Sequence, residues 1–255
     1  MIKMKHNTLT AAALLSLISH VHSWWILGCG QPVAVERVDP IVNPGQDVKS
    51  EHLHSVLGGN AFASNLTYDL TQQSTCTTCV VTKDLSNYWT PTVYFHARNG
   101  SFLKVRQLGG ASIYYQQRHD LKDPEYPRIH AFPRDFRMLA GNPMLRNYTD
   151  DLAGRAISYA CISGRPEPAV PGFPNHTCGG QLRIRVDFPM CWDGKNVDSD
   201  DHKSHVAYPS GLDNGICPES HPKRLIHLFM ETSWIVQDFD DQWDGDKQPF
   251  ALSNG

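Results

Sequence analysis

Short runs of alternating apolar and polar residues constrain this chain more than any other feature of its sequence. The clearest run spans 182–188, where Leu, Ile, Val and Phe alternate with Arg, Arg and Asp. A period of two places the apolar side chains on one face of a β-strand and the polar ones on the other. Pro189 ends the run, because proline cannot donate to a strand ladder. No segment shows ten or more residues at helical period with caps, so the sequence predicts a chain built from strands.

Further strands are expected wherever the same alternation recurs between turn residues. Asn99-Gly100 is a tight hairpin signal between two of them. A long loop rich in Pro and Gly follows at 164–180. Short strands divided by turns predict an all-β fold, a single β-sandwich of jelly-roll type with long disulfide-tethered loops. The further expected strands are Thr92–His96, Phe102–Val105, Ala111–Gln117, Ala156–Cys161, Leu225–Met230 and Thr232–Val236.

Residues 1–23 have the pattern of a secretory signal peptide. Lys3 and Lys5 precede an apolar run over 11–18, and Ser23 suits cleavage before Trp24. That run is shorter than the roughly 20 residues that span a bilayer, and no later stretch approaches this length. We therefore expect a secreted, extracellular protein with one β-rich domain over 24–255 and no membrane span. The mature chain is net acidic and has no basic stripe, which argues against a nucleic-acid partner.

All seven cysteines follow the signal peptide. In an oxidising compartment the default is disulfide formation, which leaves one cysteine over. Cys76 and Cys79 have the spacing of a redox or zinc pair, but a second ligand pair and a strand-to-helix context are lacking. We predict at least two disulfides, with Cys76 and Cys79 included. Glycosylation of surface loops is expected at four sequons, which begin at Asn65, Asn99, Asn147 and Asn175.

The segment Asp187–His205 concentrates more chemistry than any other part of the sequence. Cys191 can anchor its turn, Trp192 offers a flat apolar ring, and Asp193 begins a tight turn with Gly. Several carboxylates and the imidazoles of His202 and His205 follow within a few residues. A solvated acidic loop would be the ordinary interpretation. The embedded Trp and Cys favour an ordered loop at a functional site instead.

His52 and His54 form a second polar group, far away in the sequence. On a strand these two side chains would point to the same face, as a pair for one metal ion or one substrate group. We predict that they approach His202 and His205. Two surface histidines near a turn are the simpler alternative. If the four meet, their ligand types suit zinc, copper or manganese, so a divalent metal is the alternative cofactor, with none assigned.

Several short motifs together resemble one known family. The chain is similar, over nearly its whole mature length, to the secreted fungal family catalogued as domain of unknown function 1996. That family has no settled activity to transfer, but some members are joined to carbohydrate-binding modules, which implies glycan chemistry by analogy alone. The motifs are Ser50-x-His52-x-His54, Cys76-Thr-Thr-Cys79, Asp84-x-Ser-Asn-Tyr-Trp-x-Pro91, Ala131-Phe-Pro-x-x-Phe-Arg-Met138, Cys191-Trp-Asp-Gly194, Asp201-His-Lys-Ser-His205, Cys217-Pro218 and Leu252-Ser-Asn-Gly255.

The favoured function is an extracellular enzyme acting on cell-wall or extracellular polysaccharide, either a hydrolase or a lyase. Sugar rings would stack on aromatic side chains while polar groups contact the hydroxyls. Paired carboxylates would suit a hydrolase. A His-Tyr pair would suit a lyase, with an arginine neutralising a uronate carboxylate. The expected catalytic residues are His54, Asp193, His202 and His205, and the expected substrate-binding residues are Trp89, Tyr115, Arg118, Arg137 and Trp192.

Two other functions use the same residues. A non-catalytic glycan-binding or wall-associated protein would keep the aromatics and use the histidines as hydrogen-bonding scaffold. A His-rich metal-binding protein without glycan chemistry is the third reading. The segment 249–255 has the pattern of an apolar strand entering a turn. The family resemblance implies that more chain follows, so we expect this form to be a fragment that is less stable than an extended one.

Overall fold

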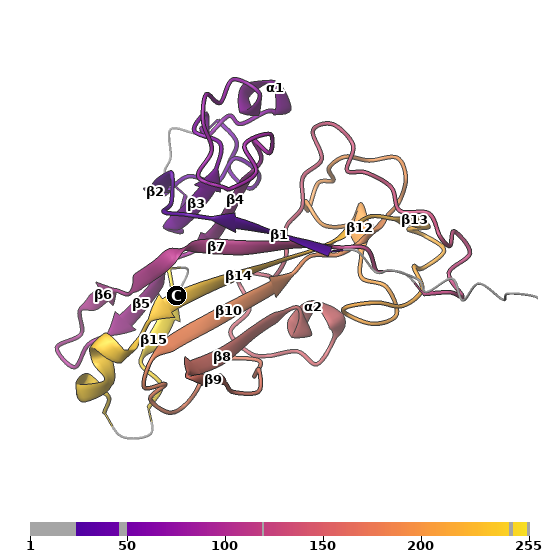
Figure 1. Cartoon of the computed structure of the whole chain (residues 1–255). Helices are drawn as coiled ribbons and strands as arrows, with labels where there is room; N and C mark the ends of the chain where they lie inside the picture. The colour runs from indigo at the N-terminus through magenta and orange to yellow at the C-terminus, as the bar shows by residue number, and fades with distance from the viewer. Residues whose placement is uncertain (1–23, 46–49, 119, 245–246, 254–255) are drawn as a thin grey trace, which may run out of the picture.

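The computed structural model describes residues 24–45, 50–118, 120–244 and 247–253. The expected signal peptide, 1–23, and the last two residues of the expected terminal turn lie outside the described residues. Antiparallel strands joined by long loops make up most of the regular secondary structure of the described chain, as Figure 1 shows. The prediction of an all-β, sandwich-like fold is therefore confirmed.

A six-stranded antiparallel sheet forms the centre of the fold, with the order β1-β7-β14-β10-β8-β9. Figure 1 shows these strands side by side, with β14 between β7 and β10. Because no two neighbours in this sheet except β8 and β9 are consecutive in the chain, long-range pairing creates it. The strands are β1 (Trp24–Cys29), β7 (Arg106–Gln116), β14 (His227–Ile235), β10 (Gln181–Asp187), β8 (Ile157–Ser163) and β9 (Arg165–Pro166).

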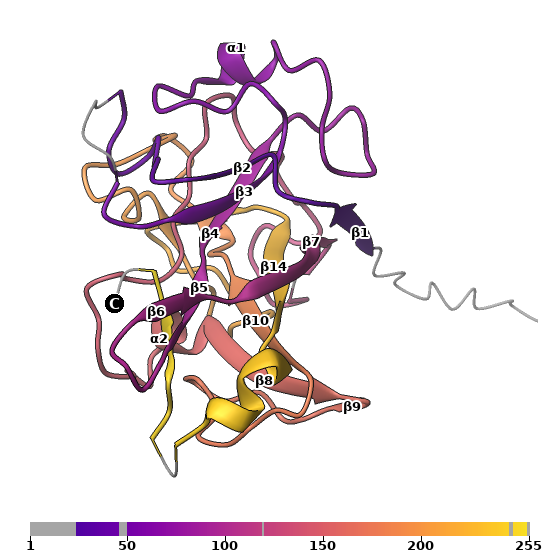
Figure 2. The ribbon, with the colours of Figure 1, turned by 90° about the vertical axis from the view of Figure 1, so that its left-hand side faces the viewer.

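Two three-stranded sheets cover one face of this central sheet, which we call the inner face. One has the order β2-β3-β4, and its core cluster includes Leu57, Ile113 and Met230. The other has the order β15-β5-β6, and its core cluster includes Phe95 and Trp234. Figure 2 shows the two small sheets from a second direction. Their strands are β2 (Ala34–Glu36), β3 (His54–Gly58), β4 (Asn87–Pro91), β15 (Phe250–Leu252), β5 (Val93–His96) and β6 (Phe102–Lys104).

A third small sheet, β12-β11-β13, lies beyond one end of the central sheet (Figure 1). Here the guanidinium of Arg224, only 1% exposed, donates to the Asp123 carboxylate at 2.6 Å. Such a buried pair is costly to break, because removing one partner strands the other charge. The pair therefore fixes how the 120–130 segment lies against β13. The strands are β12 (Val206–Ala207), β11 (Cys191–Trp192) and β13 (Lys223–Arg224).

Helices contribute little to the described fold. They are α1 (Tyr68–Thr71), α2 (Leu152–Arg155) and the 3-10 helix η1 (Gln237–Gln242). Within the described ranges, none of them has the length and apolar character needed to cross a membrane.

Most expected strands are present, with one informative difference. The two runs expected at 225–230 and 232–236 form a single strand, β14. A register shift between Thr232 and Trp234 interrupts its pairing with β7. Such a bulge places an extra residue in one strand without ending it. The polar Glu231 therefore lies within a strand and not at a turn between two strands.

Three disulfides join distant segments of the described chain: Cys29–Cys79, Cys161–Cys178 and Cys191–Cys217. The expectation of at least two disulfides that include Cys79 is confirmed. The expectation for Cys76 is wrong, because this residue is an exposed free cysteine. The backbone explains the choice, since Cys29 and Cys79 face each other in an isolated antiparallel bridge.

Replacing Cys79 with serine should destabilise the protein strongly, because it removes the covalent link between β1 and the 76–81 segment. We expect the free energy of unfolding to fall by about 2–5 kcal/mol. Denaturant unfolding under non-reducing conditions would measure the change.

Cys76→Ser is the matched control, because it alters an exposed thiol three residues away. It should change stability by no more than about 0.5 kcal/mol. Thiol labelling of the native protein should modify Cys76 alone. Equal destabilisation by both substitutions would contradict this pairing.

Candidate functional site

The carboxylates of the predicted site loop, Asp187–His205, mostly hold the loop's own turns. Asp193 Oδ1 accepts from the backbone amides of Lys195 (2.8 Å) and Asn196 (2.9 Å). Asp201 Oδ1 accepts from the amides of Lys203 (3.0 Å) and Ser204 (2.7 Å). These backbone donors lower the pKa of Asp201 well below its usual range. The loop is thus ordered, as predicted, and both carboxylates order it.

His202 and His205 are also bonded within the scaffold. His202 Nδ1 donates to the Asp198 carboxylate at 2.8 Å. His205 is 1% exposed; its Nε2 donates to the Arg137 carbonyl at 2.7 Å, and its Nδ1 contacts the Ser199 hydroxyl at 2.9 Å. Both ring nitrogens of His205 therefore have protein partners, which leaves neither one for a metal or a substrate proton.

His52 and His54 contact each other. Neither of them joins His202 or His205 in a described group with metal-binding spacing. Their rings lie 5.7 Å apart, and His54 Nδ1 donates to the Val38 carbonyl at 2.9 Å. Burial lowers the pKa of His54. Two described groups of three residues have metal-binding spacing, and none of the four predicted histidines belongs to either. The described residues therefore give no support to a metal held by His52, His54, His202 and His205.

Three of the predicted substrate-binding side chains lie in packed or bonded positions. Arg137 donates to the carbonyls of Pro40 (2.9 Å) and Leu66 (3.1 Å), so its guanidinium joins segments of the scaffold. Trp192 Nε1 donates to the Asn196 carbonyl at 2.6 Å. The remaining one, Trp89, packs its ring against Phe62 at 5.7 Å.

Tyr115 belongs to a partly buried hydroxyl cluster on the inner face. Its ring stacks on Trp25, with centroids 5.1 Å apart, and its hydroxyl bonds with that of Tyr88. Tyr88 in turn donates to the Asp84 carboxylate at 2.7 Å. Burial first, and then the Asp84 charge, raise the pKa of Tyr115. Such a hydroxyl is a poor base at neutral pH.

Arg118 is the predicted residue that leads to the site which we favour, the outer face of the central sheet. The polar members of the alternating strands share this face, opposite the two small sheets. Across β1, β7, β14 and β10, in that order, one aromatic or cationic group per strand forms a continuous stack. Its members are Trp24, Tyr114, Phe229 and Arg185.

The rings at the centre of this stack lie close together. Tyr114 and Phe229 are direct register partners, and their rings are 4.2 Å apart at an interplanar angle of 7°. The Arg185 guanidinium carbon lies 4.0 Å from the Phe229 centroid. Trp24 stacks on Tyr114 at 6.5 Å and is 58% exposed. The stack thus leads from a solvent-exposed indole to a charged group.

At the charged end, His227 lies between two carboxylates. Its side chain is 0% exposed, with Nε2 at 3.1 Å from Asp187 Oδ1 and Nδ1 at 3.3 Å from Asp213 Oδ1. Burial disfavours the imidazolium, but the two carboxylates outweigh burial and raise the pKa of His227. Neither nitrogen has a partner in hydrogen-bond geometry among the described residues. Electrostatic attraction to the two carboxylates holds the ring, without well-aligned hydrogen bonds.

Asp187 and Asp213 differ in how firmly they are held. Arg185 donates two short bonds to Asp187, from Nε at 2.8 Å and Nη2 at 2.6 Å. Asp213 is 50% exposed and lies 3.4 Å from Arg118 Nη2. The adjacent His227 lowers the pKa of Asp213 against the effect of burial, and Arg118 adds to this. Asp187 is thus a fixed group, and Asp213 is the accessible carboxylate.

A third carboxylate lies beside the middle of the stack. Tyr114 donates its hydroxyl to Glu231 Oε2 at 3.2 Å. Arg183 Nε lies 3.6 Å from Glu231 Oε1. Burial first, and then the Glu231 charge, raise the pKa of Tyr114. The face therefore places a hydroxyl donor and a carboxylate next to stacked rings.

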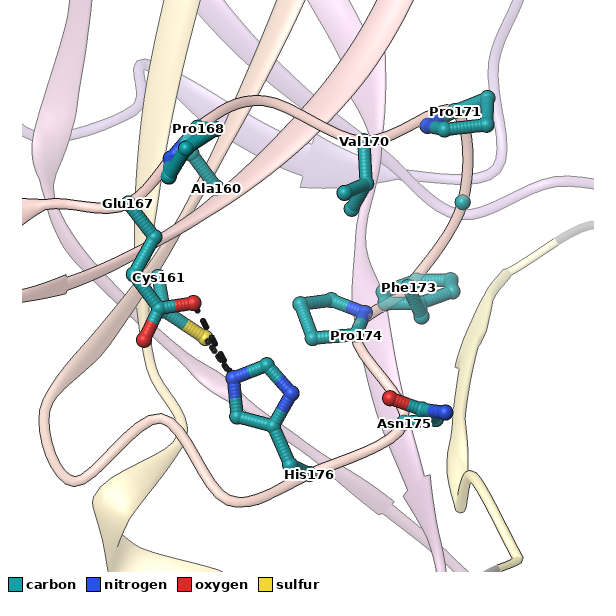
Figure 3. A pocket seen from close by; sticks show the side chains of 11 residues that line it. Ala160, Cys161, Glu167, Pro168, Val170, Pro171, Phe173, Pro174, Asn175 and His176 are labelled. Carbon is teal, nitrogen blue, oxygen red and sulfur yellow. Dashed lines mark hydrogen bonds and ion pairs between the residues drawn. The ribbon is translucent and has the colours of Figure 1, made fainter.

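A pocket of about 340 Å³ also lies against β8 (Figure 3). His176 Nε2 lies 3.1 Å from Glu167 and 3.8 Å from the Cys161 sulfur. That sulfur is already bonded to Cys178, so the three groups do not form an available metal-ligand set. The remaining lining is largely apolar and comes from a proline-rich loop. The described lining of this pocket forms a cavity but provides no evident catalytic or metal-binding group.

The sequence contains a signal for the outer face. Strand 182–188 alternates Arg and Asp with apolar residues, and His227, Phe229 and Glu231 alternate with Leu and Met in β14. Charged residues at every second position of the first strand, and His and Glu on either side of Phe in the second, predict a face with polar groups on each strand. The sequence pattern does not show that the two strands are neighbours in one sheet.

Asp201→Ala should loosen the Asp187–His205 loop, because the backbone amides at 203 and 204 would lose their acceptor. Loss of a cap of this kind costs about 1 kcal/mol, which corresponds to a fall in Tm of about 2–4 °C. Because the folded pKa of Asp201 is depressed, its contribution is present above about pH 4 and is lost as the pH falls. Thermal melts from pH 7 to pH 3 would test both effects.

Asp200→Ala is the control, since Asp200 is the exposed neighbour. Its Tm should match the wild type across the same range. A difference between the Asp201 variant and the wild type that persists unchanged at pH 3 would contradict the proposed role of the charged carboxylate.

Comparisons with known proteins bear on the family and leave the activity open. No curated protein and no solved structure matches this chain significantly. The family described as Domain of unknown function (DUF1996) matches residues 39–255, which include every residue of the outer-face site except Trp24. This match covers most of the sequence, and the chain therefore belongs to the DUF1996 family.

Proposed function

We propose that this protein acts in the extracellular space on a polysaccharide, which it binds across the outer face of the central sheet and cleaves there. The observation that carries the proposal is the stack of Trp24, Tyr114, Phe229 and Arg185 across four strands, which ends beside carboxylates and His227. Flat rings suit sugar faces, and adjacent polar groups suit hydroxyls.

Trp24 is the main contact for a sugar ring. More than half of its surface is exposed, and Tyr114 supports the indole from one side. An aromatic side chain that is held flat loses little entropy when a ligand covers its other side. Polar groups of Tyr114 and Glu231 would then lie next to the neighbouring sugar unit.

Cleavage would use the pair formed by Tyr114 and Glu231. The hydroxyl and the carboxylate are already joined by a hydrogen bond, so protons can pass between them and a bound substrate. A hydrolase would use Glu231 toward the glycosidic oxygen or a water. A lyase would use a base beside a uronate carbon, with an arginine on the uronate carboxylate. The products distinguish these two reactions.

A purely binding role is the second candidate, and a separate observation favours it. Each of the three carboxylates on this face has an arginine neighbour: Asp187 with Arg185, Asp213 with Arg118, and Glu231 with Arg183. Ion pairing of this kind orders a binding surface without requiring any chemistry. Such a protein would retain polysaccharide and release no product.

The extracellular location rests on the expected signal peptide and agrees with the three disulfides. Disulfides persist in oxidising compartments and are rare in the cytosol.

Trp24→Ala should weaken polysaccharide binding about tenfold, because truncating a dominant aromatic contact commonly costs more than about 1 kcal/mol and tenfold corresponds to about 1.4 kcal/mol. Affinity electrophoresis or calorimetry against plant and fungal wall polysaccharides would measure this change. Phe102→Ala is the control; Phe102 is 59% exposed but lies on β6, outside the outer face. Equal loss in both variants would argue against this surface.

Glu231→Gln should abolish product formation while binding is largely kept. New reducing ends would identify a hydrolase, and absorbance near 235 nm would identify a lyase. Asp69→Asn is the matched control, since Asp69 is an exposed carboxylate paired with an arginine elsewhere on the chain. Retention of polysaccharide by the wild type without product would assign the binding role instead.

A further inference from the structure

Three cationic side chains surround the half-exposed carboxylate of Asp213. Its oxygens lie 3.3 Å from His227 Nδ1, 3.4 Å from Arg118 Nη2 and 3.9 Å from Arg185 Nη2. These cations come from β14, from the segment that follows β7, and from β10. Asp213 belongs to none of these strands, because a loop places it over the outer face.

The fit between Asp213 and these cations is poor. None of its three contacts meets hydrogen-bond geometry, whereas the bonds from Arg185 to Asp187 are 2.6 and 2.8 Å. His227 Nδ1 is completely buried and has no hydrogen-bond partner within the described chain. Leaving such a group unpaired costs about as much as a hydrogen bond contributes. The cationic group is therefore suited to an anion that fits it better.

The loop that carries Asp213 is closed at its base by hydrogen bonds. The Ser210 amide donates to the Ile216 carbonyl at 2.9 Å, and the Ile216 amide donates to the Ser210 hydroxyl at 3.0 Å. Cys217 then fixes the chain through its disulfide. Gly211 and Gly215 flank the tip, and Gly215 adopts a φ of 126° that other residues rarely take.

We propose that Arg118, Arg185 and His227 form a subsite for the carboxylate of an acidic sugar, and that Asp213 occupies this subsite when no ligand is bound. The inference rests on the proposed function, since it names the substrate class of the same face. The inference also describes the unliganded protein, in which the Asp213 carboxylate takes the place of the ligand carboxylate.

The chemistry of the subsite favours a carboxylate. Guanidinium donors suit the oxygens of a planar carboxylate. Arg185 already gives Nε and Nη2 to Asp187, so the terminal nitrogens of Arg118 are the main donors for a ligand. Gln116 accepts from Arg118 Nε at 2.9 Å and so orients that guanidinium. Arg185 lies on the Phe229 ring, at the end of the aromatic stack. A uronate ring that follows a sugar stacked on the aromatics would bring its carboxylate to this point.

The test compares polygalacturonate oligosaccharides with their methyl esters, which have the same sugar chain without the charge. Calorimetry on the wild type should show tighter binding of the acid form, with a preference that weakens as salt rises. Asp213→Asn should raise affinity for the acid form about tenfold, because it removes the competing charge. The same substitution should leave affinity for the methyl ester unchanged.

Two further variants separate the subsite from general charge effects. Arg118→Gln should remove most of the preference for the acid form. Asp244→Asn, an exposed carboxylate near Arg98, is the control and should behave as the wild type. Oligosaccharides with sulfate esters form a third ligand arm, and tighter binding of these than of the acid form would overturn the assignment to a carboxylate.

The outcomes distinguish this inference from the proposed function. Equal binding of acid and ester forms by the wild type and by Asp213→Asn would overturn the subsite while polysaccharide binding stands. Weaker binding of the acid form by Asp213→Asn would also overturn it, because Asp213 would then contact the ligand. If neither these ligands nor neutral wall polysaccharides bind, the proposed function fails, and the inference fails with it.

Discussion

The pairing of β14 with β7 on one side and β10 on the other is the interaction on which the rest of the structure depends. Met230 belongs to the core beneath β2-β3-β4, and Trp234, near the other end of the same strand, belongs to the core beneath β15-β5-β6. One strand therefore closes both cores. The remaining face of β14 holds His227, Phe229 and Glu231, so the strand that organises the interior also positions the candidate site.

The outer face tolerates buried charged groups because positive and negative groups alternate across it. Arginine, carboxylate and imidazole neighbours follow one another across the sheet, so each charge removed from water lies near an opposite one. Isolated burial of any of them would be far more costly. The balance is less complete at Asp213, the exposed member, whose three cationic neighbours are farther away than those of Asp187.

The sequence was sufficient for the strands and insufficient for the site. Alternation identified the strand at 182–188 and the hairpin at Asn99-Gly100, because strand periodicity and turn chemistry are local properties. The acidic loop misled for the same reason: a run of Asp residues looks alike whether it binds a ligand or caps turns, and here Asp193 and Asp201 accept from neighbouring amides. Trp24, Tyr114, Arg185, Asp213 and His227 come from five separate segments, and only long-range strand order brings them together. The choice of Cys29 over Cys76 as the partner of Cys79 is equally a matter of tertiary pairing.

The two tryptophans at the start of β1 have a consequence for the edge of the sheet. Successive residues of a strand point to opposite faces, so Trp24 stacks on Tyr114 outside while Trp25 stacks on Tyr115 inside. A slip of one residue would exchange the two faces, and a slip of two would separate each indole from its tyrosine. An edge strand has a neighbour on one side only and is the easiest to misalign. Here a stacked Trp–Tyr pair on each face favours one register of β1 against β7.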